Sequence, residues 1–282
     1  MRPPEHPRPL RAVFVAGTGT DVGKTVVTAG LLRALRGLGV AAQAVKPVQT
    51  GVGPATTGAP TGDAAAYTAA VGDMHPVGAL APAAALRTFS LPASPHLAAA
   101  EEGARLDAVG LARSIREHWD ANPEAELLLL EVAGGLLAPL NSKEAMLDLM
   151  AEVGAPVVLV VRNELGALNH ALLSLAALQG HGLALAGLAI VGPPAEVAEA
   201  SGAAVLEENI RFLRERLERD SRGAVLCIVP RAELSVPAGW ERIAGALLPL
   251  ARALCEEAGG AAAPGPGDLE ARDHAALWHP YA

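Results

Sequence analysis

Residues 17–25, which read GTGTDVGKT, constrain this chain more than any other stretch. They follow the short apolar run 12–16 and precede residues 25–38, whose apolar positions fit a helix. A glycine-rich turn between strand and helix lets backbone N–H groups face phosphate oxygens, and the helix N-terminus adds the positive end of its dipole. Five residues separate Gly17 from Gly23, one more than in the common phosphate loop. The stretch predicts a loop that binds the phosphates of a nucleotide.

Two side chains of this loop have distinct expected roles. Lys24 is expected to reach the outer phosphates of the nucleotide, and the Thr25 hydroxyl is expected to ligate Mg²⁺. Asp21 has an equally plain alternative role as the N-cap of the following helix. The other expected nucleotide contacts in the loop are Thr20, Val22 and Gly23.

Beyond the loop, apolar runs alternate with segments of helical pattern. This alternation predicts βαβ units and an α/β, P-loop NTPase-type fold, with a mostly parallel sheet that carries helices on both faces. The chain divides into an N-terminal extension (1–11), a single domain (12–256) and a linker with a tail (257–282). Further strands are expected at 41–45, 127–131, 157–161, 183–191 and 224–229, a helix at 201–219, and a loop at 51–62.

Composition narrows the possible classes of protein. Hydrophobic residues make up 51% of the chain and aromatic residues only 3%, so aliphatic side chains must fill the core. A net charge of -8 argues against a general nucleic-acid binder, which needs a basic face. No secretion signal or membrane-spanning apolar run is evident. Cys227 and Cys255 lack metal-ligand spacing, which favours a reduced, cytoplasmic location.

Five further motifs follow the phosphate loop in order. They are KPVQTG at 46–51, Asp63, ASPH at 93–96, EVAGG at 131–135 and LGALNHA at 165–171. Together with the phosphate loop these motifs resemble those of the dethiobiotin synthetases, and the resemblance extends from about residue 13 to residue 254.

The resemblance implies an ATP-dependent ring closure. Diaminopelargonate and CO₂ form a carbamate, ATP phosphorylates the carbamate, and the second amine closes the ureido ring of dethiobiotin and expels phosphate. Lys24, Lys46 and Thr50 would be catalytic, with Lys46 and Thr50 also holding the substrate. Asp63 and Glu131 would join Thr25 as Mg²⁺ ligands, because hard oxygen donors suit this ion.

The remaining implied contacts lie farther along the chain. Glu131 and Gly134 would also contact the nucleotide, and Pro230 is a candidate to contact its base. A partner subunit would bind the distal carboxylate of the substrate, which implies a homodimer; the residues involved would be Gly166, Ala167, Leu168 and Asn169. Plainer alternatives are a surface lysine for Lys46, a turn residue for Asp63, a packed loop residue for His96 and a helix cap for Asn169.

Two positions depart from the family pattern. Val132 stands where the family has glycine, and it would crowd the site only if the backbone there had a positive φ. The family asparagine that reads the purine edge has no amide counterpart in residues 189–192, so the sequence does not specify the base. Both departures keep open a degenerate paralogue that binds nucleotide without closing the ring.

The tail carries a separate hypothesis. Residues 278–281 (WHPY) resemble a segment near the start of diaminopelargonate aminotransferases, so 268–282 is interpreted as the beginning, or a relic, of a fused aminotransferase. The alternative is a chance match of four residues.

Other P-loop functions compete with the ligase. A cobyrinate-amidating enzyme would need a glutaminase domain with a nucleophilic cysteine, for which no residues remain. A partition or cell-positioning switch ATPase usually has a second lysine early in the loop, and this loop has none.

Overall fold

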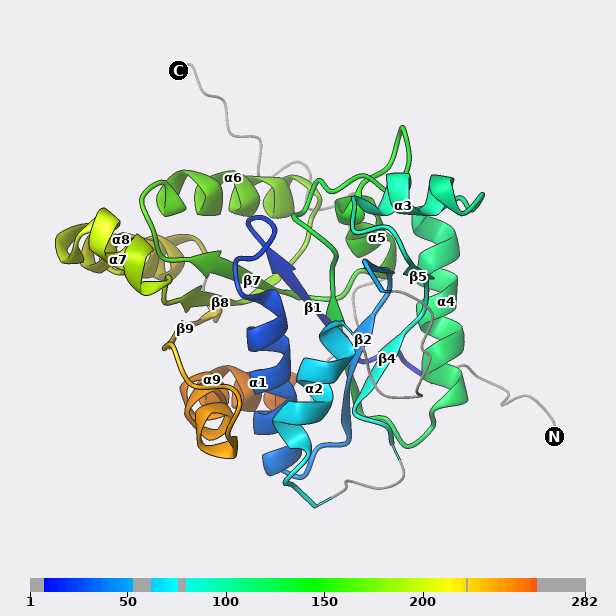
Figure 1. Ribbon diagram of the computed structural model, residues 1–282, viewed down its shortest axis with the longest axis horizontal. Coiled ribbons are helices and arrows are strands. Elements are labelled where there is room, and N and C mark those ends of the chain that lie inside the picture. The colour runs from blue at the N-terminus through cyan, green and yellow to red at the C-terminus, as the bar shows by residue number, and fades with distance from the viewer. Residues whose placement is uncertain (1–7, 53–61, 76–79, 222, 258–282) are drawn as a thin grey trace.

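A seven-stranded sheet in the order β4-β2-β6-β1-β7-β8-β9 forms the centre of the molecule, and all of its strand pairs are parallel. The computed structural model describes residues 8–52, 62–75, 80–221 and 223–257 (Figure 1). The strands are β1 (Ala12–Gly17), β2 (Ala42–Lys46), β4 (Ala83–Ala85), β6 (Leu127–Glu131), β7 (Val157–Arg162), β8 (Leu185–Val191) and β9 (Val225–Val229). A second small sheet pairs β3 (Gln49–Thr50) with β5 (Thr88–Phe89). The predicted α/β fold with a mostly parallel sheet is confirmed.

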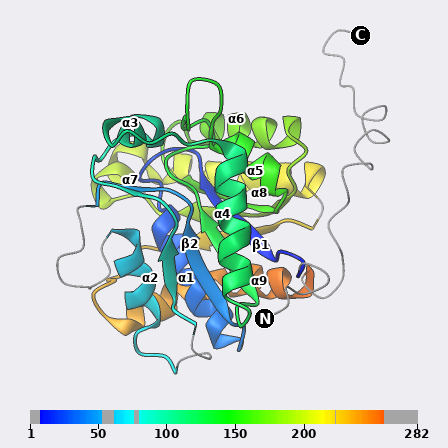
Figure 2. The same cartoon turned by 90° about the vertical axis from the view of Figure 1, so that its right-hand side faces the viewer.

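Helices cover both faces of the sheet. One apolar core packs α1, α2 and α9 against it, and the opposite cores hold α4, α5, α6 and α8. Figure 1 shows α1, α2 and α9 together on one side and α6 on the other, and Figure 2 looks onto α4. The helices are α1 (Lys24–Gly37), α2 (Asp63–Val71), α3 (Pro95–Glu101), α4 (Ala108–Ala121), α5 (Met146–Val153), α6 (Ala167–Gly180), α7 (Ala195–Ser201), α8 (Ala203–Asp220) and α9 (Pro237–Glu257).

The strand order places the phosphate loop at a topological switch point. β1 lies between β6 and β7, whereas the next long strand in the chain, β2, lies on the far side of β6. In open parallel sheets, loops part at such a point and leave a crevice beyond the carboxyl ends of the strands. Residues 18–23, after β1, therefore share this crevice with the ends of β2 and β6.

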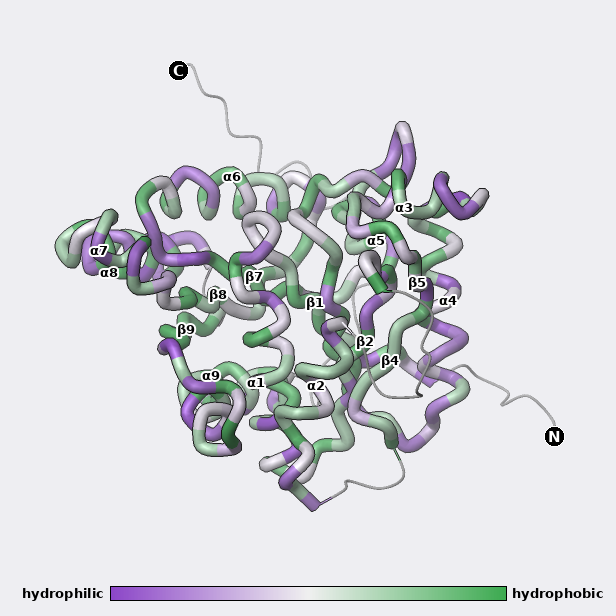
Figure 3. The backbone as a smooth tube through the Cα atoms, viewed as in Figure 1, coloured by the Kyte–Doolittle hydropathy of each residue, from purple (hydrophilic) through white to green (hydrophobic). Residues whose placement is uncertain are grey.

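The central strands of the sheet consist mostly of aliphatic residues, which can be buried on both faces. The strands β1, β2 and β6 are buried along their whole length, as expected for a sheet covered on both faces. Figure 3 shows hydrophobic residues along the inner strands and hydrophilic stretches on the outer helix α4. Within the described ranges, no helix combines the length and apolarity that crossing a membrane requires.

The predicted strands and helices are confirmed to within two residues at each end. The strands β3, β4 and β5 were not predicted, because strands of two or three residues are too short to show a periodicity. Most of the loop predicted at 51–62 and all but the first residue of the tail at 257–282 fall outside the described residues.

Part of the predicted N-terminal extension packs on the domain. The Arg8 guanidinium lies 3.4 Å from the ring centroid of Trp119. It donates hydrogen bonds to four main-chain carbonyls at the end of α4 and just beyond, those of Trp119, Asn122, Pro123 and Ala125. Carbonyls at a helix C-terminus lack partners within the helix and attract cations, so Arg8 caps α4.

Candidate active site

A cavity of about 950 Å³ opens at the carboxyl ends of β1, β2 and β6. Its wall contains the phosphate loop, the segment after β2, the start of α2, the segment before α3 and the segment after β6. The candidate residues that line it are Thr20, Asp21, Gly23, Lys24, Thr25, Lys46, Thr50, Asp63, Glu131 and Gly134. Most of the site proposed from sequence is thus brought to one place.

The phosphate loop has the backbone that its glycines predict. Gly23 has φ 103°, and a Cβ atom there would lie 3.1 Å from the side chain of Val191. The positive φ therefore favours glycine, and a Cβ atom would also press against Val191. Gly23, not Asp21, is the N-cap of α1, so the alternative role of Asp21 as a cap is wrong. Asp21 itself has φ 57°, and its carbonyl accepts a hydrogen bond from Arg162.

The side chain of Lys24 folds back onto the phosphate loop. Its ammonium donates a 2.7 Å hydrogen bond to the Gly19 carbonyl. Burial first, and then the nearby charge of Lys46, lower the pKa of Lys24 to about 8, against the opposing effects of Glu131 and Asp21. An incoming phosphate would therefore meet a partly desolvated lysine that needs only to exchange one neutral acceptor for a charged one.

Thr25, Asp63 and Glu131 converge in the same cavity. The Thr25 hydroxyl lies 2.9 Å from Oδ1 of Asp63 and 2.9 Å from Oε1 of Glu131. Asp63 begins α2 and Glu131 ends β6, so three separate elements bring the oxygens together. One hydroxyl and two carboxylates are hard donors of the kind that Mg²⁺ binds, leaving room for water and phosphate oxygens.

Lys46 bridges the two carboxylates. Its ammonium forms an ion pair with Asp63 and lies 3.1 Å from Oε1 of Glu131. Lys46 is 8% exposed and Glu131 is fully buried, so each charge depends on the other for compensation. The alternative that Lys46 is an ordinary surface lysine is wrong. A cation already lies against the oxygens predicted to hold Mg²⁺, which supports the fit of a cation to this donor set.

The structure adds Tyr67, which the sequence analysis missed. Its hydroxyl donates a 2.6 Å hydrogen bond to Oε2 of Glu131, and both side chains are buried. Burial, followed by the charge of Glu131, raises the pKa of Tyr67 well above its usual value, so the phenol remains a donor. The spacing of four residues from Asp63 puts the two side chains on one face of α2, and this was the signal available in the sequence.

Other predicted residues lie beside the cavity or away from it. Val22 is buried and packs over Gly17. Pro230 follows β9, next to the end of β8, and is not part of the cavity wall.

His96 is exposed, and its Nδ1 lies 3.0 Å from the hydroxyl of Ser94, a residue that does line the cavity. Residues 166–169 at the start of α6 also lie outside this wall, and Gly166 and Asn169 are exposed.

The two departures from the family pattern have structural counterparts. Asp21 is the single non-glycine residue with positive φ in the described part of the chain, so Val132 does not need the conformation that glycine permits. Its side chain is buried in the core next to α4 and α5, and its N–H donates to the Val15 carbonyl. Val191 packs on Gly23 instead of offering an amide.

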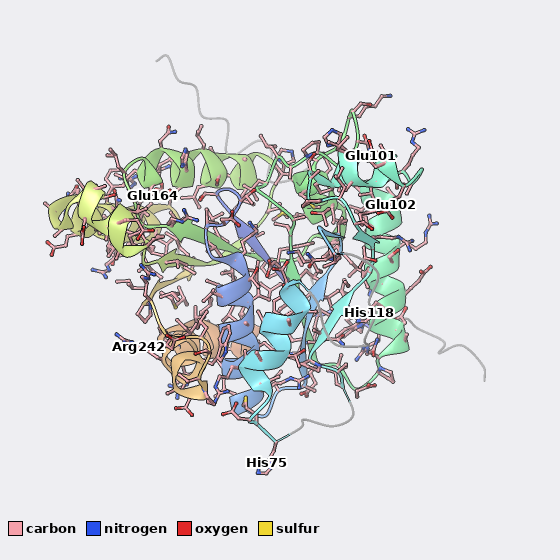
Figure 4. All side chains as sticks on the ribbon, viewed as in Figure 1. His75, Glu101, Glu102, His118, Glu164 and Arg242 are labelled. Atoms are coloured by element: carbon pink, nitrogen blue, oxygen red, sulfur yellow. The ribbon has the colours of Figure 1, made fainter. Side chains whose placement is uncertain are left out.

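Ionisable side chains elsewhere do not form part of this site. His75, Glu101, Glu102 and Arg242 lie at the surface (Figure 4) and do not line the cavity. His118 and Glu164 also lie outside the cavity wall (Figure 4).

Comparison with known proteins gives a consistent family. A family model described as an AAA domain matches residues 11–238. The ATP-dependent dethiobiotin synthetase BioD of Pseudomonas aeruginosa strain UCBPP-PA14 is 42% identical over 236 residues, covering 81% of this chain and 93% of the relative. The protein with the same name from Caulobacter sp. strain K31 is 36% identical over 245 residues, covering 84% of this chain and 93% of the relative.

The structural neighbours are more distant. The septum site-determining protein MinD of Pyrococcus horikoshii, solved with Mg-ADP, gives a TM-score of 0.51 at 17% identity, covering 89% of this chain and 98% of that one. At this identity the likeness shows a shared fold alone.

Proposed function

The chain belongs to the dethiobiotin synthetase family, an ATP-dependent family of biotin biosynthesis, and we propose how its described residues divide the work of closing the ureido ring. The observation that carries the proposal is the convergence on one cavity of the phosphate loop, two carboxylates and a second buried lysine. Phosphoryl transfer to a weakly nucleophilic carbamate depends on charge neutralisation and alignment, which these groups provide.

The phosphate loop would position ATP. Backbone N–H groups of 20–23 face the phosphates, and Lys24 moves from the Gly19 carbonyl to the transferred phosphoryl group. Thr25, Asp63 and Glu131 would hold Mg²⁺, which, when bound, neutralises charge on the phosphate oxygens. The chain's own contribution is to fix these oxygens on β6, α1 and α2 before the nucleotide arrives.

Lys46 and Thr50 would hold the carbamate. Lys46 lies at the carboxyl end of β2, and Lys46 and Thr50 line the same cavity as the phosphate loop, which supports binding of the carbamate between them. A carbamate oxygen attacks the γ-phosphorus of ATP, the bond from phosphorus to the ADP oxygen breaks, and a carbamoyl phosphate forms. The second amine of the substrate then attacks the carbamoyl carbon and loses a proton, and phosphate leaves with the carbamate oxygen.

A homodimer would complete the substrate site. Gly166 and Asn169 at the start of α6 lie outside the cavity of their own subunit, which supports a role across an interface. Leu165 and Leu173 flank this segment and are 76% and 62% exposed, an apolar surface of the kind that subunit contacts bury. We propose that residues 166–169 bind the distal carboxylate of the partner subunit's substrate.

Two further assignments stay proposals. Pro230 directly follows Val229, whose carbonyl accepts a hydrogen bond from the Gly192 N–H, and we propose that the base of the nucleotide stacks on Pro230. Val191 has no side-chain amide that could select a purine. Cys227 and Cys255 are both free thiols, which supports a reduced, cytoplasmic location.

The test is dethiobiotin formation from diaminopelargonate, bicarbonate and Mg-ATP, with phosphate release measured in parallel. Product is expected from the unmodified protein and is expected to fall by about 100-fold or more in Lys24→Ala and Lys46→Ala, as when a preorganised charge is removed. Lys143→Ala, which changes an exposed lysine, is the matched control and should behave as the unmodified protein. Phosphate release that is the same with and without diaminopelargonate, and that yields no dethiobiotin, would instead support a switch ATPase.

A further inference from the structure

The two oxygens of the Glu131 carboxylate have different partners. Oε1 faces the cavity and lies 2.9 Å from the Thr25 hydroxyl and 3.1 Å from the Lys46 ammonium. Oε2 accepts the 2.6 Å hydrogen bond from Tyr67. Oε1 therefore contacts residues of the site, and Oε2 contacts a residue of the protein interior.

Tyr67 is well placed to hold this arrangement. Its side chain is fully buried in the core between α1, α2 and the sheet, so the ring cannot swing away. It lies one helical turn after Asp63 on α2, so the same helix presents one carboxylate to the cavity and orients the other. A free carboxylate can rotate and bind a cation with one oxygen or with both.

We propose that Tyr67 is a positioning residue for the metal site, which directs Glu131 to bind the ion through Oε1 alone. The inference rests on the proposed function in that it takes Thr25, Asp63 and Glu131 as the Mg²⁺ ligands. Hydrogen-bonded partners of ligating carboxylates fix ligand orientation and strengthen metal binding. The phenol contributes through Glu131 and does not itself contact nucleotide or carbamate.

The first test measures metal binding without turnover. Mn²⁺ is titrated into the protein with ADP present, and free Mn²⁺ is followed by its electron paramagnetic resonance signal. Tyr67→Phe keeps the ring and removes only the hydroxyl, and it is expected to weaken Mn²⁺ binding by about 10-fold. Metal-free ADP binding should be unchanged, because the phosphate loop is untouched.

The matched control is Thr68→Ala. The hydroxyl of the neighbouring Thr68 donates a hydrogen bond to the Ala64 carbonyl on the same helix. Thr68→Ala therefore also removes one partly buried side-chain hydrogen bond from α2. Its Mn²⁺ affinity should stay within about 2-fold of the unmodified protein, since general loosening of a helix by one such bond is small. Equal weakening in Thr68→Ala and Tyr67→Phe, or no weakening in Tyr67→Phe, would overturn the proposal.

A second measurement needs no substitution in the site. The chain has two tyrosines, Tyr67 and Tyr281, so protein labelled with ¹³C at the tyrosine ζ carbon gives two signals, and Tyr281→Phe assigns them. Adding Mg²⁺ to the ADP-bound protein should shift the Tyr67 signal, because the charge on its hydrogen-bond partner is then shared with the ion. A Tyr67 signal whose chemical shift does not change when Mg²⁺ is added would overturn the proposal, even if Tyr67→Phe fails to fold.

Neither readout uses diaminopelargonate. If the chain makes no dethiobiotin but both readouts respond as expected, the role of Tyr67 stands and the proposed reaction fails. If dethiobiotin forms and neither readout responds, the reaction stands and the role of Tyr67 fails.

Discussion

The Lys46 ammonium lies 3.1 Å from Oε1 of Glu131, the same oxygen that lies 2.9 Å from the Thr25 hydroxyl. The positive charge of Lys46 thus lies among the oxygens expected to bind Mg²⁺. Binding of the ion would displace Lys46 from Glu131 and free its charge for the anionic carbamate. With the roles proposed for Lys46 and Glu131, this ion pair would couple metal binding to binding of the carbamate.

Replacing this lysine should separate the two roles. Lys46→Met is expected to tighten Mn²⁺ binding by about 10-fold, because a competing positive charge a few ångströms away is removed. It should also abolish dethiobiotin formation. In EDTA the variant should lose about 3–5 kcal/mol of unfolding free energy, since the buried charge of Glu131 then lacks the lysine that compensates it. Lys143→Met is the control, and Mn²⁺ binding that weakens in Lys46→Met would refute the competition.

Val132 is expected to be a structural residue without a cost to catalysis. Its side chain is fully buried and its backbone does not need glycine. Val132→Gly should therefore lower the unfolding free energy by about 2–4 kcal/mol through lost burial and added chain entropy, without raising kcat. Chemical denaturation and the dethiobiotin assay check the two parts. A Val132→Gly enzyme that is faster than the unmodified protein would mean that the side chain crowds the site.

Arg8 is expected to stabilise the domain from outside the sheet. Arg8→Ala removes hydrogen bonds to four carbonyls and a contact with the Trp119 ring, so the unfolding free energy should fall by about 1.5–3 kcal/mol. Arg113→Ala, an exposed arginine of α4, is the control. Dethiobiotin formation should be unaffected in both variants at 25 °C. An unchanged denaturation midpoint in Arg8→Ala would show that the cap contributes nothing.

If residues 166–169 complete the partner subunit's site, as proposed, two inactive variants should complement each other. In Lys46→Ala and Asn169→Ala homodimers every site has a defect. A hybrid dimer has one site with both residues intact, so an equal mixture that exchanges subunits should regain about a quarter of full activity. Two Lys46→Ala preparations mixed in the same way are the control. Activity in the mixture no higher than in the separate variants would place residues 166–169 outside the partner's site.

The sequence predicted the fold well because its signals were local. Alternating apolar runs and the loop at 17–25 determine the strands, the helices and the strand end where phosphates bind. The site was predicted in outline, since Lys46, Asp63 and Glu131 each stand at the end or beginning of a recognisable element. Tyr67 was missed because a tyrosine inside a helix has the pattern of a core residue, and its bond to Glu131 depends on how α2 packs against β6. The pairing of Lys46 with both carboxylates likewise needed the tertiary structure.

The most direct test of the account follows an oxygen atom. The enzyme is given ¹⁸O-labelled bicarbonate, diaminopelargonate and unlabelled Mg-ATP, and the phosphate product is analysed by mass spectrometry before the label exchanges with water. If the carbamate oxygen attacks ATP and leaves with phosphate, each dethiobiotin formed should be accompanied by one phosphate that carries a single ¹⁸O. Dethiobiotin formed together with unlabelled phosphate would contradict a phosphorylated carbamate and the roles given to Lys24 and Lys46.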